Sequence, residues 1–93
     1  MEIPKKERIV HEWYLIIYQE PNKQYNLSAT YNLSSYQNHL RMIKSFGTII
    51  AIKDRATKEE KTVAAKLVES KNNGKIMNIE AELLKIHFTL YQQ

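Results

Sequence analysis

The chain has 93 residues, no cysteine and a formal net charge of +4. This length leaves room for one domain, which we place at residues 1–93. The missing cysteines exclude a disulfide scaffold, and the three histidines are too far apart along the chain to suggest a zinc site. The fold must therefore be stabilised by side-chain packing.

The first residues and the apolar runs of the chain are the features that indicate its cellular compartment. Residues 1–8 contain no apolar stretch of the kind a signal peptide needs, and the apolar run 13–18 is far too short to span a membrane. We therefore expect a cytoplasmic protein with no membrane partner. The many Lys, Asn and Ile residues are typical of an AT-rich genome and suggest a phage or a low-GC bacterium as the source.

The first half of the chain predicts an antiparallel hairpin. Residues 9–18 are β-branched and aromatic without a helix or strand breaker, which favours a strand. Residues 20–23 follow with proline at the second position of a turn. Apolar and polar residues then alternate over 25–31, the pattern of a half-buried second strand.

A helix and a third strand are expected next. Ser34 and Gln37 fit a capping box that opens the helix, and Gly47 suits the left-handed position that often ends one. The continuous apolar run 48–52 then favours a strand in the middle of a sheet. A right-handed crossover through the helix would lay this third strand parallel to the second.

The pattern in the last third of the chain is compatible with more than one secondary structure. Thr57 and Glu60 form a second capping box, and its helix should end near residues 71–74. Residues 76–91 carry a helical apolar stripe, but they also alternate in part, with 73–74 as a hairpin turn. We favour the helix, because the strand alternation slips at Leu84. The predicted fold class is therefore α+β, with two C-terminal helices packed on the small sheet; the alternative is a C-terminal hairpin that extends the sheet.

No arrangement for catalysis is visible in the sequence. Glu80 and His87 are seven residues apart, which on a helix leaves them too distant for a direct hydrogen bond. Gly47 and Gly74 are isolated, so no glycine-rich loop could hold a phosphate. We expect a protein without enzymatic activity, cofactor or bound metal.

The charge pattern favours nucleic acid as the partner. No acidic residue occurs between Glu20 and Asp54, and this stretch carries cations, tyrosines and amides. Cations can contact phosphates, and tyrosines on an open sheet face can stack on bases. The predicted nucleic-acid-binding residues are Tyr14, Tyr18, Lys23, Arg41, Lys44, Lys53 and Arg55. If helices cover both sheet faces instead, the tyrosines are simply part of the core.

Two further interpretations remain open. The alternative function is a protein-binding inhibitor or adaptor of the phage or mobile-element type that acts on a host protein, because tyrosines are also frequent at protein interfaces. The long apolar stripe at the C-terminus also predicts a homodimer. Its expected interface residues are Ile79, Leu83, Ile86 and Leu90. No known family is recognised in the sequence.

Overall fold

The structure is a computed structural model that describes residues 12–91. Its elements, in chain order, are β1 (Trp13–Gln19), β2 (Tyr25–Thr30), α1 (Leu33–Lys44), β3 (Thr48–Ala56), α2 (Lys58–Asn72), α3 (Ile79–Lys85) and β4 (Thr89–Leu90). The predicted α+β class and its strand–helix–strand order are confirmed. Residues 9–11 of the first predicted strand lie outside the described residues.

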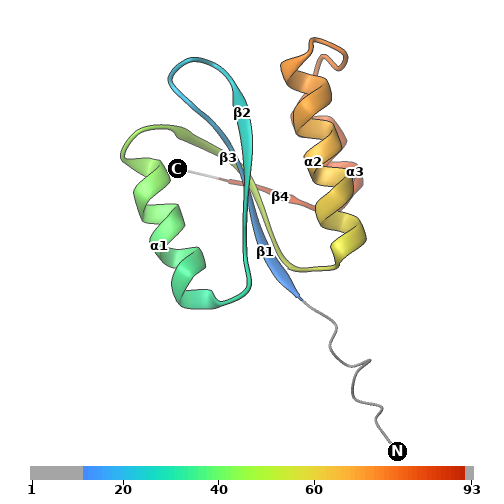
Figure 1. The fold of residues 1–93 in the computed structure, drawn as a ribbon. Coiled ribbons are helices and arrows are strands. Elements are labelled where there is room, and N and C mark those ends of the chain that lie inside the picture. Colours follow the sequence, from blue (N-terminus) through green and yellow to red (C-terminus); the bar gives the residue numbers. More distant parts are fainter. Residues whose placement is uncertain (1–11, 92–93) are drawn as a thin grey trace, which may run out of the picture.

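The strands of residues 12–91 form one sheet in the order β2-β1-β3-β4, and each neighbouring pair is antiparallel. Because β1 lies between β2 and β3, these two strands run in the same direction, as the crossover through α1 predicts. Helix α1 lies on one side of the sheet, and α2 and α3 lie on the other (Figure 1). The molecule therefore has three layers.

Each sheet face has its own apolar core. Leu15 and Ile17 of β1 face α2 and α3, where they pack with Leu83 and Phe88. Ile16, which points the opposite way because strand side chains alternate, packs under α1. Helices thus cover both faces, so the open face expected for the tyrosines is absent from the described part of the chain.

Helix α1 begins earlier than predicted, at an asparagine cap. Asn32 has an extended backbone, and its Oδ1 accepts a hydrogen bond from the Ser35 amide at 2.8 Å. The predicted cap, Ser34, is already inside the helix. Asparagine and serine are about equally good caps, so local preference could not decide between Asn32 and Ser34.

Gly47 does not end the helix as predicted, because α1 stops at Lys44 with Ser45 as its C-cap. The glycine of residues 12–91 with a positive φ is Gly74, at 74°, and not Gly47. A Cβ atom on Gly47 would lie 2.6 Å from the carbonyl oxygen of Gln19. Glycine is therefore needed here because the chain passes close to the end of β1.

The predicted capping box of α2 is confirmed. The Thr57 hydroxyl accepts from the Glu60 amide at 3.1 Å, and the Glu60 carboxylate accepts from the Thr57 amide at 2.9 Å. The helix ends at Asn72, and Gly74 takes the left-handed conformation beyond it. The hairpin considered at 73–74 does not form.

The last residue of α2 is bonded to the first residue of β2. The Asn72 side chain accepts from the Tyr25 amide at 2.7 Å and donates to the Tyr25 carbonyl at 2.9 Å. Both backbone groups of Tyr25 therefore point away from β1, towards the outer edge of the sheet. This pair of bonds fixes the end of α2 to that edge.

The C-terminal segment is only partly helical. Helix α3 covers Ile79–Lys85, and the chain then reverses through His87, whose φ is 69°. The reversal buries Phe88 to 3% exposure and lets β4 pair with β3. The prediction of a continuous helix over 76–91 was therefore wrong. Such a helix would neither bury Phe88 in this way nor pair with β3.

This arrangement also occupies the residues expected at a dimer interface. Ile79 and Leu83 are 3% and 0% exposed in the core of the chain itself, and Ile86 and Leu90 pack against that core. Ile79 and Leu83 are therefore not available to a second copy while the fold is intact, whereas Ile86 and Leu90 are only partly buried. No helix within residues 12–91 is long and apolar enough to cross a membrane.

Candidate nucleic-acid interface

Acidic side chains are distributed unevenly between the two helical layers. Helices α2 and α3 together carry five glutamates, whereas α1 carries no acid. The reason lies in the sequence, because β2 and α1 both come from the acid-free stretch 21–53. Arg41 and Lys44 lie in the last turn of α1. The cations on the outer surface of α1 therefore have no carboxylate of the same helix beside them.

Arg41 and Lys44 are neighbours on this helix, because residues three apart share a face. Both are exposed. The Arg41 guanidinium donates to Asn38 Oδ1 at 3.0 Å, and Lys44 Nζ lies 5.3 Å from the centroid of the Tyr91 ring. The structure thus brings together two of the predicted cations and places an aromatic ring beside one of them.

The two predicted stacking tyrosines lie beneath α1. The Tyr14 ring lies 5.0 Å from the Tyr36 ring, and the Tyr18 ring lies 6.1 Å from the Phe46 ring in an edge-to-face contact. Both tyrosines are half-buried. Phe46, at 44% exposure, is the more accessible ring of the second pair. Phe46 is not among the stacking residues predicted from the sequence.

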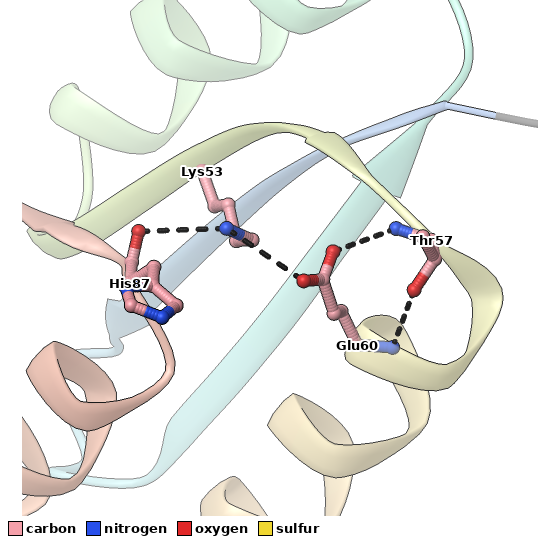
Figure 2. A network of polar contacts seen from close by, with 4 residues as sticks. All are labelled: Lys53, Thr57, Glu60 and His87. Carbon is pink, nitrogen blue, oxygen red and sulfur yellow. Dashed lines mark hydrogen bonds and ion pairs between the residues drawn. The ribbon is translucent and has the colours of Figure 1, made fainter.

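The other predicted cations are dispersed. Lys53 points to the α2 side, where its Nζ lies 4.0 Å from Glu60 Oε2 and 3.5 Å from the His87 carbonyl oxygen (Figure 2). Its side chain is only 13% exposed. Lys23 lies in the hairpin turn, and Arg55 lies near the end of β3. These three cations are not grouped with Arg41 and Lys44.

A cavity of about 270 Å³ opens beside β3, where its pairing with the short strand β4 ends. Residues from α1, from β3 and from the segment after α3 meet there. The lining residues are Tyr36, Ile52, Lys53, Asp54, His87 and Thr89. They are far apart in the sequence, and for this reason the sequence pattern gave no sign of the cavity.

The backbone around this cavity is unusual. The register of β1 and β3 shifts so that Asp54 and Arg55 lie opposite the single residue Tyr14. Arg55 has a φ of 59°, and His87 across the cavity has a φ of 69°. Left-handed conformations are costly for residues other than glycine, and such strain is frequently found at functional sites.

Tyr36 connects the cavity to the surface of α1. Burial raises the pKa of the Tyr36 phenol above its ordinary value, and the nearby Asp54 carboxylate and the Tyr91 and Tyr14 rings raise it further. The phenol therefore stays neutral at physiological pH and can donate a hydrogen bond. Because Tyr91 also contacts Lys44, a series of neighbouring side chains leads from Lys44 through Tyr91 to Tyr36 at the cavity.

Replacing Asp54 with Asn should lower the pKa of the Tyr36 phenol. The carboxylate disfavours a second negative charge nearby, and the amide does not. Because the fold raises this pKa, the stability contributed by the neutral phenol is complete below the ordinary tyrosine pKa and is lost as the pH rises through the raised value. Ring-labelled tyrosine NMR would follow the titration.

The same substitution in a Tyr36→Phe background provides the control. With the phenol removed, Asp54→Asn should leave the titration curves of the distant tyrosines unchanged. An unaltered Tyr36 titration in the single variant would show that Asp54 does not act on this phenol.

Neither the possible metal ligands in residues 12–91 nor comparison with known proteins narrows the choice of function further. Residues 12–91 contain no group of three His, Cys, Asp or Glu side chains that could hold a metal ion. Comparison with known proteins finds no matching family model, no similar curated protein and no similar solved structure. The α1 surface and the adjoining cavity are therefore the features that bear on function.

Proposed function

We propose that this chain is a small, non-catalytic binding module that binds single-stranded nucleic acid through α1 and the adjoining edge of the sheet. The observation that carries this proposal is the pair of exposed cations, Arg41 and Lys44, on a helix without acidic residues. Cations without competing carboxylates are suited to phosphate contacts.

The aromatic rings beside these cations favour a single strand over a duplex. Phe46 is 44% exposed, and Tyr91 is half-buried beneath the Lys44 ammonium. Exposed rings can stack on unpaired bases, whereas the bases of a duplex are already stacked on one another. The net charge of +4 adds a general attraction to polyanions. Such a module would act in the cytoplasm.

Replacing Arg41 and Lys44 together with Ala should weaken binding mainly at low salt. Each phosphate contact on a single strand contributes about 0.7 to the slope of log affinity against log salt concentration, so losing two should flatten the slope by about 1.4. Fluorescence anisotropy with labelled oligo-thymidine at several salt concentrations measures this slope.

Lys66→Ala is the matched control, since Lys66 is an exposed lysine on α2. It should leave the slope unchanged. Phe46→Ala should instead cost about 1–3 kcal/mol of binding free energy with little dependence on salt. Absence of binding to any single- or double-stranded oligonucleotide at low salt would end the nucleic-acid proposal.

A protein-binding function has one observation in its favour. Met42 of α1, which lies between Arg41 and Lys44 in the chain, is 54% exposed, and an exposed apolar side chain beside these cations can contact a partner protein. An inhibitor or adaptor of the mobile-element type could use this surface. If oligonucleotides do not bind, site-directed cross-linking from Met42 is the next experiment.

A further inference from the structure

The cavity at the β3 edge contains a group that phosphate binding does not explain. Asp54 is exposed there, and no hydrogen bond or ion pair joins its carboxylate to another residue of 12–91. A carboxylate repels phosphate and only accepts hydrogen bonds. It suits a ligand group that presents hydrogen-bond donors.

We propose that this cavity binds the base of a guanine nucleotide within the single strand that α1 holds, and the inference rests on that proposed function. Guanine carries two adjacent donors, N1–H and the N2 amino group, on its Watson–Crick edge. The two oxygens of the Asp54 carboxylate can accept both. Unpaired bases are commonly recognised by hydrogen bonds to this edge.

The other lining residues complement the rest of the base. Guanine presents two acceptors, O6 and N7, to which a lysine ammonium can donate. Lys53 also lines the cavity, and its ammonium has three N–H donors. Its contacts on the α2 side, 4.0 Å to Glu60 Oε2 and 3.5 Å to the His87 carbonyl oxygen, are longer than the roughly 2.7–2.9 Å of a strong charge-assisted bond, so this side chain can turn from them towards a ligand. Adenine would place its N1 acceptor against the Asp54 carboxylate.

The size and the lining of the cavity suit one base. Its volume of about 270 Å³ is just below the roughly 300–1,000 Å³ of sites for larger small molecules. The Tyr36 ring and Ile52 provide apolar wall for a planar ligand. At the β3 bulge, Asp54 and Arg55 share the position opposite Tyr14, and bulges commonly redirect side chains beside binding sites.

The α1 cations are placed to hold the same strand. Lys44 lies over Tyr91, and the segment that contains Tyr91 also contributes Thr89 to the cavity. A nucleotide backbone that contacts Lys44 can therefore direct an adjacent base towards Asp54. Phosphate contacts would hold the strand, and the cavity would select the base.

The test compares short labelled oligo-thymidine strands that carry one central guanine, adenine or hypoxanthine. The guanine strand should bind about tenfold more tightly than the all-thymine strand. Hypoxanthine lacks the N2 amino group and should give an intermediate affinity. Asp54→Asn should abolish the guanine preference while leaving the affinity for oligo-thymidine undiminished, because it removes no cation.

Glu69→Gln is the control, since it neutralises an exposed carboxylate on α2, and it should keep the guanine preference. Circular dichroism of each variant verifies the fold. If oligo-thymidine binds but guanine gives no advantage, or if Asp54→Asn keeps the advantage, the inference is overturned and the proposed function stands. If no strand binds at low salt, both are overturned.

Discussion

Replacing Leu83 with Ala is expected to lower the free energy of unfolding by about 2–5 kcal/mol. Leu83 is 0% exposed and packs in the core between the sheet and helices α2 and α3. Small domains have only about 5–15 kcal/mol of stability, so this loss would be a large part of the total. Urea denaturation followed by circular dichroism measures it.

Leu84 provides a neighbouring control with the same side chain. It is 52% exposed, so Leu84→Ala should change the free energy of unfolding by no more than about 0.5 kcal/mol. The experiment also tests the predicted dimer interface. If Leu83 stabilises the monomer core, the loss is independent of protein concentration, whereas an interface residue would make it concentration-dependent. Equal effects of the two substitutions would contradict the position of α3.

Replacing Gly47 with Ala is expected to cost about 1–3 kcal/mol. The new Cβ atom would lie 2.6 Å from the Gln19 carbonyl oxygen, a backbone atom held in the sheet at the end of β1. Either β1 or the end of α1 must then move, and the packing between them is lost. The midpoint of thermal or urea unfolding would report the change.

Gly74→Ala separates steric contact from backbone conformation. Nothing lies within 4 Å of a Cβ atom at Gly74, but its φ of 74° is left-handed. The expected cost there is about 1–2 kcal/mol and comes from the backbone alone. A Gly47→Ala protein as stable as the wild type would show that β1 can move away at no cost.

The elements predicted well from the sequence are those specified by nearby residues. The hairpin of β1 and β2 follows from alternation and a proline-containing turn, and the Thr57–Glu60 box sets the start of α2. The reversal at His87 has no such local signal. Its cause is the burial of Phe88 and the pairing of β4 with β3, contacts between segments far apart in the chain.

The candidate site also combines residues that local sequence predicts with features that only tertiary contacts determine. The absence of acids in the sequence placed Arg41 and Lys44 among five candidate cations, and it is the structure that separates these two, on one helix, from the others. Strand alternation predicted the shared face of Tyr14 and Tyr18 but could not show that α1 would cover it. The cavity beside β3 depends on tertiary contacts and on a bulge, and neither leaves a pattern in the sequence.

The two bonds between Asn72 and Tyr25 have a consequence for how molecules of this protein meet. Strand β2 is an outer strand without any charged residue, and uncharged outer strands readily pair with strands of other molecules. The Asn72 amide already occupies the donor and acceptor that a foreign strand would use first at Tyr25. One side chain thus protects this end of the sheet from intermolecular strand addition and from the aggregation that can follow.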